Sequence, residues 1–151
     1  MLSTTHRMLD GCLEKRLSKS GKRRVNYWVH PDLEDVLYKA VHHNHPCTVW
    51  TKESKANYDW HYRHFCALCD EYTYRYGKIH KTDALLRDVL KQAPKNIPHI
   101  PQTPFKLAMA TALKCINTSD AVGSYRAFYK TKRDRFEMSW TKRETPEWFS
   151  E

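Results

Sequence analysis

Side chains that can do chemistry gather between His42 and His80. This stretch holds six of the nine histidines and three of the five cysteines, within a dense run of tyrosine, tryptophan and phenylalanine residues. Imidazole titrates near neutral pH, thiolates bind soft metals, and aromatic rings stack on bases. The stretch could therefore carry a metal site, acid–base chemistry or nucleic-acid contacts. The ordinary alternative is a helix with one apolar seam and one solvated face.

A zinc site is the first interpretation of the stretch. His61, His64, Cys66 and Cys69 form an HxxHxCxxC pattern, and zinc takes four imidazole or thiolate ligands in a tetrahedron. On one continuous helix, however, His61 and Cys69 point about 80° apart, so they cannot share an ion. We therefore expect no metal and no cofactor. The cysteines are interpreted as free thiols and small core residues.

A polar stripe along the same helix is the second interpretation. Carboxylates can hold a histidine in one tautomer, which suits acid–base catalysis. The structural alternative is a wet helix face on which Glu71 and Arg75 form an ordinary i,i+4 pair. The candidate catalytic residues are His45, Glu53, His61, His64, Glu71 and Arg75, and the pocket would be completed by His42, His43 and Asn57.

Basic residues interleaved with aromatic residues are the third candidate feature. The net charge is +9, and the two ends are more basic than the centre: residues 1–24 carry seven Lys or Arg against two acids, residues 25–100 ten against nine, and residues 101–151 nine against six. Cations can pair with phosphates while rings stack on unpaired bases. The alternative is that the rings are core and the cations are solvated. We expect DNA as the partner, bound by Arg23, Arg24, Lys78, Arg126, Lys130, Lys142, Arg143, Trp148 and Phe149.

The spacing of apolar residues predicts an all-α fold, as a single compact domain over residues 1–151. A long central helix should start near Thr48 or Thr51 and stop at Gly77. Its core seam should contain Tyr58, Tyr62, Phe65, Cys69, Tyr72 and Tyr76. Other helices are expected over about residues 1–13, 31–42, 82–91 and 119–133.

The connecting segments are predicted from composition. Residues 14–24 should form an exposed basic loop, and residues 25–29 have β-type side chains but no evident strand partner. Residues 93–106 hold four prolines, which predicts an extended crossing. The large apolar residues of the tail, among them Trp140, Trp148 and Phe149, should dock onto the domain.

Composition also bears on location. Charged residues make up 28% of the chain, and no apolar run approaches the ~20 residues that span a bilayer. The first residues lack the apolar centre of a signal peptide. We therefore expect a protein without membrane contact in the cytoplasm, which is the host cytoplasm if the protein is phage-encoded.

Several short motifs resemble a family of uncharacterised tailed-phage proteins. They are Asn44-His45-Pro46, Val49-Trp50, Glu53-Ser54, Asn57-Tyr58, Trp60, Cys69-Asp70-Glu71-Tyr72-Thr73, Arg75-Tyr76-Gly77-Lys78, His80 and Pro146-Glu147-Trp148-Phe149. The resemblance covers most of the chain. It implies kinship but no activity.

A weaker resemblance links the chain to the phage pyrimidine-dimer DNA glycosylases, the endonuclease V type. It rests on a His-Pro step, a long central helix ending in a basic turn, and a C-terminal Pro-x-Trp-aromatic sequence. It implies a compact helical enzyme that flips a base out of the duplex. In that family the glycosidic bond is cleaved through a Schiff base on the N-terminal amine, with a glutamate stabilising the intermediate. Trp148 and Phe149 would match the family's aromatic patch on the DNA.

This sequence departs from the glycosylases at its start. The glycosylases place the nucleophile and the glutamate in an N-terminal segment. This chain begins inside a stretch, Leu2 to Gly11, that resembles the tailed-phage family, whose members carry extra residues before it. Met1 before the bulky Leu2 should be retained, so no small exposed amine is expected. No motif supports Glu14 as the glutamate, so its role is not carried over.

The expected function is therefore a DNA-binding protein resembling phage DNA-repair glycosylase and AP-lyase enzymes, acting on damaged or modified bases. Whether it is an enzyme stays open. The alternative is a non-enzymatic phage accessory protein that binds nucleic acid or a host protein.

Overall fold

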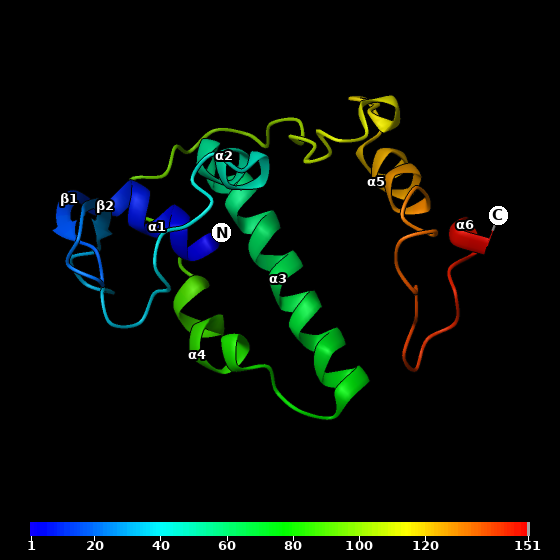
Figure 1. Ribbon diagram of the computed structural model, residues 1–151, viewed down its shortest axis with the longest axis horizontal. Helices are drawn as coiled ribbons and strands as arrows, with labels where there is room; N and C mark the ends of the chain where they lie inside the picture. Colours follow the sequence, from blue (N-terminus) through cyan, green and yellow to red (C-terminus); the bar gives the residue numbers. More distant parts are fainter. Residues whose placement is uncertain (151) are drawn as a thin grey trace. The chain divides into compact units, whose positions relative to one another are not determined.

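Figure 1 shows a computed structural model of the chain, which describes residues Met1–Ser150. The chain divides into two compact units. The first unit is Met1–Thr103 and the second begins at Pro104. The expected single domain stays a prediction.

The first unit is built around helix α3, the long green helix of Figure 1. Its buried core joins Leu2, Leu37, Tyr58, Leu86, Leu90 and Ile97. These residues come from two neighbouring helices, from α3 itself and from irregular segments. The elements of this unit are α1 (Leu2–Asp10), β1 (Cys12–Leu17), β2 (Arg24–Val29), α2 (Pro46–Glu53), α3 (Lys55–Tyr76) and α4 (Lys81–Leu90).

The all-α prediction is wrong, because the first unit also contains an antiparallel hairpin. Strands β1 and β2 pair from Cys12↔Val29 to Leu17↔Arg24. The partner missing from the prediction is Cys12–Leu17, which spans the end of the helix expected over residues 1–13 and the start of the loop expected over residues 14–24. Gly21 supplies a positive φ of 71° in the turn, a conformation that costs glycine little. The Arg16 guanidinium lies 4.6 Å from the centre of the Tyr27 ring, so charged residues contribute to the pairing.

The predicted helix over residues 31–42 is also wrong. This segment forms turns instead, although Leu37 within it is buried. The reason is Arg7, which is only 1% exposed. Its guanidinium donates hydrogen bonds of 2.8 to 2.9 Å to the carbonyls of Trp28, Glu34, Leu37 and Tyr38. In a helix, carbonyls such as that of Glu34 would instead accept from the N–H four residues further on.

The predicted central helix is broken at Ser54 into α2 and α3. The side-chain amide of Asn57 donates a 2.7 Å hydrogen bond to the backbone carbonyl of Trp50. In a continuous helix that carbonyl would accept from the Ser54 N–H instead. Ser54 is instead extended, at φ −153°, and its hydroxyl accepts from the Asn57 N–H as an N-cap. The end of the helix agrees with the prediction, since α3 stops at Tyr76 before Gly77 at φ 67°.

The apolar seam of α3 is present along most of its length. Tyr58 is fully buried and Cys69 is 5% exposed. Tyr62 and Phe65 pack against the core, whereas Tyr76 at the end of the helix is 55% exposed. Residues 93–106 form no helix or strand, as their prolines predict.

The second unit contains a 3-10 turn, η1 (Leu113–Cys115), and the helices α5 (Ala121–Lys130) and α6 (Glu147–Ser150). The Asp120 carboxylate caps α5 by accepting a 2.8 Å hydrogen bond from the Gly123 N–H. This helix ends three residues before the predicted Arg133. The aromatic tail packs on itself and on α5: the ring centres of Trp140 and Phe149 lie 4.7 Å apart, and Arg126 of α5 lies over Trp148. Docking of the tail onto a single domain stays a prediction. Over residues 1–150 no helix has the length and apolar character of a membrane span.

Candidate functional site

The interior of the first unit is unusually polar. Helix α1 is buried on all sides from Leu2 to Arg7. Buried polar groups need hydrogen-bond partners, and one left without a partner calls for an explanation. The buried polar residues of this unit are Ser3, Thr4, Thr5, His6, Arg7, His30, Thr48, Thr51, Ser54, Asn57 and Asp83.

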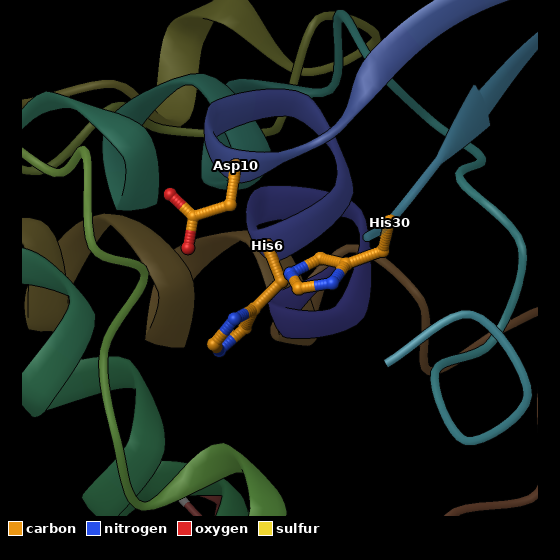
Figure 2. A group of neighbouring side chains, drawn as sticks. All are labelled: His6, Asp10 and His30. Atoms are coloured by element: carbon orange, nitrogen blue, oxygen red, sulfur yellow. The ribbon is translucent and has the colours of Figure 1, made fainter. Parts of the chain in front are cut away.

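One cluster in this interior joins titratable groups from two elements. His6 and Asp10 lie one turn apart on α1, and His30 follows β2 directly. One nitrogen or carboxylate oxygen from each lies within 4.8 Å of the other two. Figure 2 shows the His30 ring pointing toward His6. We call His6, Asp10 and His30 the histidine–aspartate cluster.

Gly11 allows the end of β2 to approach α1 closely enough for this cluster to form. A β-carbon at Gly11 would lie 2.4 Å from the carbonyl oxygen of Arg7 and 2.5 Å from that of Val29. Both contacts are with backbone, which cannot swing away as a side chain can. Only glycine therefore lets the end of β2 approach α1 closely enough for His30 to face His6.

The tautomer of His30 follows from its hydrogen bonds. Its Nδ1 accepts from the N–H groups of Asp32 and Leu33, at 3.2 and 3.0 Å. Nδ1 therefore carries the lone pair, and in the neutral ring the proton sits on Nε2. That Nε2 is buried and has no hydrogen-bond partner. His30 thus offers the cluster an unused N–H donor.

The tautomer of His6 follows from Tyr58. The Tyr58 hydroxyl donates its one proton to the carbonyl of Leu90, at 2.8 Å. Its oxygen must then accept from His6 Nε2, which is also 2.8 Å away. His6 is therefore protonated at Nε2, and its Nδ1 lone pair is left as an acceptor.

Both rings are neutral at neutral pH. Burial lowers the pKa of His6 to about 4, and the neighbouring His30 adds to this effect, while Asp10 and the backbone of Gln92 oppose it. Burial likewise lowers the pKa of His30. The Asp10 carboxylate is held in place by the N–H groups of Lys95 and Asn96, at 2.7 and 2.9 Å.

Two histidines and an aspartate are also metal-ligand types, but their hydrogen bonds do not suit a metal. A metal on His30 Nε2 would need the lone pair there and the proton on Nδ1. That proton would face the two backbone N–H groups that now donate to Nδ1. A metal-bound histidine normally donates its other N–H to an acceptor. The cluster therefore fits a hydrogen-bonded guest better than zinc.

The first half of the predicted polar stripe lies near the junction of α2 and α3. His45 caps α2, since its Nδ1 accepts from the Cys47 N–H at 3.2 Å. The Glu53 carboxylate accepts from the Thr103 hydroxyl at 2.8 Å. His61 Nδ1 lies 2.6 Å from the Thr51 hydroxyl, and burial lowers the pKa of this histidine to about 4. These three contacts serve to hold the elements together.

The second half of the stripe is more exposed. His64 stacks on Trp60, with ring centres 5.3 Å apart. Glu71 and Arg75 form the i,i+4 ion pair that the structural alternative expected, at 2.7 Å. No finding tests a catalytic role for these residues, which therefore remains a prediction.

Cys69 of the HxxHxCxxC pattern lies near α4, whereas His61 of the same pattern lies near α2. Burial raises the pKa of the Cys69 thiol to about 11, and the nearby Asp83 of α4 adds to the effect. Cys69 is thus a protonated core residue, while His61 contacts Thr51 of α2. The helix geometry expected from the sequence separates them as predicted.

An aromatic pocket lies in the second unit. It has a volume of about 300 Å³ and is lined by Tyr129, Met138, Ser139, Trp140, Trp148 and Phe149. Two guanidinium groups lie over its rings: Arg126 is 5.6 Å from the centre of Trp148, and Arg133 is 4.4 Å from the centre of Phe149. Three of the predicted DNA-binding residues are therefore at this pocket: Trp148 and Phe149 line it, and Arg126 lies over Trp148. Lys130 is the last residue of α5.

The remaining predicted DNA-binding residues are dispersed. Arg23 and Arg24 lie at the turn and first residue of β2, and Lys78 follows the end of α3. Lys142 adopts a positive φ of 57° in the tail, next to Arg143. All five are exposed.

The histidine–aspartate cluster was not among the predicted sites. The i,i+4 spacing of His6 and Asp10 within the predicted first helix is a signal that could have found two of its members. His30 could not be added from spacing, because only the hairpin brings it back to α1. Comparisons with protein-family models, with curated proteins and with solved structures found no match.

Proposed function

We propose that this chain is a DNA-binding protein whose second unit holds an unpaired base. The observation that supports the proposal is the aromatic pocket with its two arginines. A volume of about 300 Å³ is at the small end of ligand sites, and suits one base better than a stretch of duplex.

The pocket rings offer faces on which a base can stack. Stacking of this kind contributes about 1–3 kcal/mol per base and tolerates any sequence, because every base has a π-face. Trp140, Trp148 and Phe149 are half-buried, so their faces are supported by neighbours but still reachable. An unpaired or displaced base fits this arrangement, whereas a base inside a duplex does not.

The cations around the pocket suit the phosphates on either side of such a base. Arg126 and Arg133 lie over pocket rings, and Lys130, Lys142 and Arg143 are nearby in the sequence. Each phosphate contact releases counterions, so affinity should fall steeply with salt. The stacked rings should supply the part of the affinity that salt does not change.

We further propose that the protein acts on damaged or modified bases, as the phage repair glycosylases and AP lyases that it resembles do. The observation that favours an enzyme is the histidine–aspartate cluster, in which burial keeps two imidazoles neutral beside a carboxylate. Perturbed titratable groups gather at functional sites. The alternative is a non-enzymatic phage accessory protein that binds nucleic acid or a host protein.

Fluorescence anisotropy tests the binding proposal. The probes are a labelled single strand, a duplex, and a duplex with one abasic site opposite an unpaired base, each between 50 and 200 mM salt. We expect the duplex to bind more weakly than the other two. Trp148→Ala should weaken binding to the single strand about 10-fold, with the same salt dependence, while Arg143→Gln should lower the salt slope by about one contact.

Phe136→Ala is the matched control, because this ring is exposed in the same unit but does not line the pocket. Equal losses in Trp148→Ala and Phe136→Ala, or no binding at the lowest salt, would refute the proposal.

Incubation with UV-irradiated and abasic duplexes separates the two candidate functions. Base loss or strand cleavage supports the repair enzyme. Tight binding without either supports the accessory protein.

A further inference from the structure

We propose that the histidine–aspartate cluster holds one water molecule and activates it as a nucleophile for hydrolysis of a glycosidic bond. The inference deepens the enzymatic part of the proposed function and rests on it. It differs from the amine chemistry implied by the glycosylase resemblance, since here the attacking atom is a water oxygen.

The cluster presents the donors and acceptors that a single water needs. His30 Nε2–H is a donor, and it is buried without a partner. His6 Nδ1 is an acceptor, because Tyr58 and Leu90 fix the proton of that ring on Nε2. The Asp10 carboxylate is a second acceptor, with lone pairs beyond those taken by Lys95 and Asn96. A water can therefore accept from His30 and donate to both His6 and Asp10.

The spacing suits water as well. Partners arranged tetrahedrally around one water, with hydrogen bonds of about 2.8 Å, lie about 4.6 Å apart. The ligands of a tetrahedral zinc ion lie closer, about 3.3 Å apart. The three side chains place one atom each within 4.8 Å of the others, a limit that includes the separation of partners around one water. A site with three polar partners is the usual setting of a buried water.

The three hydrogen bonds leave the water one lone pair. Because both of its protons point at basic atoms, its oxygen is more nucleophilic than that of a free water. Asp10 is half-buried, whereas both histidines are almost fully buried. The substrate would therefore approach from the Asp10 side.

The reaction balances without a cofactor. The water oxygen forms a bond to C1′ of the nucleotide, and the C1′–N bond breaks, with its electron pair leaving on the base. One water proton passes to His6 Nδ1, where Asp10 lies close enough to stabilise the imidazolium. The departing base takes a proton from solvent. The products are an abasic site and the departed base, with the DNA strand intact. In a pyrimidine dimer the departed base stays joined to its neighbouring pyrimidine.

The full-length chain and a 5′-labelled, UV-irradiated duplex test this inference. One half of each reaction is heated in alkali, which cuts at abasic sites, and the other half contains borohydride, which traps Schiff bases. We expect alkali-dependent cleavage and no trapped adduct. A general base typically contributes 10²–10⁴-fold, so His6→Gln and Asp10→Asn should each slow base loss about 100-fold or more.

These variants keep most of the surrounding hydrogen bonds. In His6→Gln the amide N–H can still face Tyr58. The Lys95 and Asn96 N–H groups donate to different Asp10 oxygens, so Asp10→Asn keeps an acceptor for one of them and loses the other bond. His30→Asn keeps an acceptor for Asp32 and Leu33 but loses the reach of Nε2, so base loss should slow about 10-fold. His99→Gln, an exposed histidine elsewhere in the first unit, is the control and should match the unaltered protein.

Several results would overturn the inference. A borohydride-trapped adduct with unchanged rates in the variants would assign the attack to an amine. Loss of activity on chelation, restored by a divalent metal, would assign it to a metal site. Absence of base loss, with DNA still bound in the anisotropy experiment, would remove the hydrolytic site but leave the binding proposal standing.

A crystal structure at high resolution gives a readout that does not depend on folding of the variants. We expect one water within hydrogen-bond distance of His6 Nδ1, His30 Nε2 and an Asp10 oxygen. A direct His30–Asp10 hydrogen bond in place of that water would contradict the inference.

Discussion

The two units differ in what they bury. Of the nine buried hydrophobic residues among those described, eight lie in the first unit and only Met109 lies in the second. All nine histidines lie in residues 1–99. In the second unit, Trp148 and Phe149 are half-buried beneath Arg126 and Arg133, while the rings of Tyr129 and Phe136 are exposed. The first unit is therefore suited to stability and proton chemistry, and the second to contact with a partner.

The two units should also differ in local stability. The free energy of opening a region with many buried apolar contacts approaches that of global unfolding, whereas a region with few such contacts opens at a lower free energy. We expect the second unit to exchange its amide protons faster than the core of the first. Four predictions test the contrast, in order of decreasing effect.

The largest effect is expected from Arg7→Met. The change leaves the Glu34 carboxylate and four carbonyl groups without their buried cation. Breaking one partner of a buried ion pair costs about 3–5 kcal/mol, measured as the free energy of unfolding in urea. Arg16→Met is the control, since both members of the Arg16–Glu14 pair are largely exposed and such pairs contribute at most about 1 kcal/mol. Similar losses in the two variants would show that burial does not decide the cost.

Acid should weaken the first unit through its buried histidines. Burial lowers the folded-state pKa of His6 and of His61 to about 4, so between about pH 6.5 and pH 4 the unfolded chain binds more protons than the folded one. The free energy of unfolding should therefore fall over this range, by roughly 1–3 kcal/mol per histidine, and level off below it.

Urea titrations at several pH values check this acid dependence. His6→Gln should remove about half of the decrease, because His61 remains. The amides of α5 should show little change over this range, since residues 104–150 contain no histidine. An unchanged slope in His6→Gln would mean that His6 is not buried as neutral imidazole.

The N-caps of α3 and α5 allow a smaller, matched comparison. Ser54→Ala removes a fully buried cap from the Asn57 N–H, which should cost about 1–2 kcal/mol. Asp120→Ala removes an exposed cap from the Gly123 N–H, for about 0.5–1 kcal/mol. Amide exchange at Asn57 and Gly123 reports each loss locally. A larger effect at Gly123 would reverse the expected ranking of the units.

The smallest effect is expected on the polar stripe. Glu71→Gln breaks the i,i+4 pair with Arg75, which should cost no more than about 0.5 kcal/mol. Base loss from UV-irradiated DNA should distinguish a structural from a catalytic Glu71. An unchanged rate supports the structural alternative, and a 100-fold decrease supports the predicted catalytic role.

Some elements could be predicted from neighbouring residues in the sequence alone. The apolar spacing of Tyr58, Tyr62 and Phe65 marks the seam of α3, and Gly77 marks its end, because both act within one helix. The Asp120 cap and the prolines of residues 93–106 are equally local. The packing of the tail's aromatic rings against one another likewise follows from their apolar character.

Other elements depend on partners distant in the sequence. Residues 31–42 have a helical pattern, but Arg7 from another helix takes their carbonyls. The charged residues within 14–17 are typical of a loop, yet they belong to a strand that is stabilised by pairing with residues 24–29. For the site, the residues of the polar stripe could be found by periodicity, but His30 reaches His6 only through the hairpin and Gly11.

The guanidinium of Arg7 also has a consequence for the order of folding. Residues 30–38, which follow β2, lack a regular ladder of backbone hydrogen bonds. The carbonyls of Glu34, Leu37 and Tyr38 rely instead on the Arg7 side chain, more than twenty positions earlier. This segment cannot acquire its shape until α1 has formed and docked, so its ordering is a late, non-local step. Since His30 lies within the segment, the histidine–aspartate cluster would be assembled last, on a scaffold that is already in place.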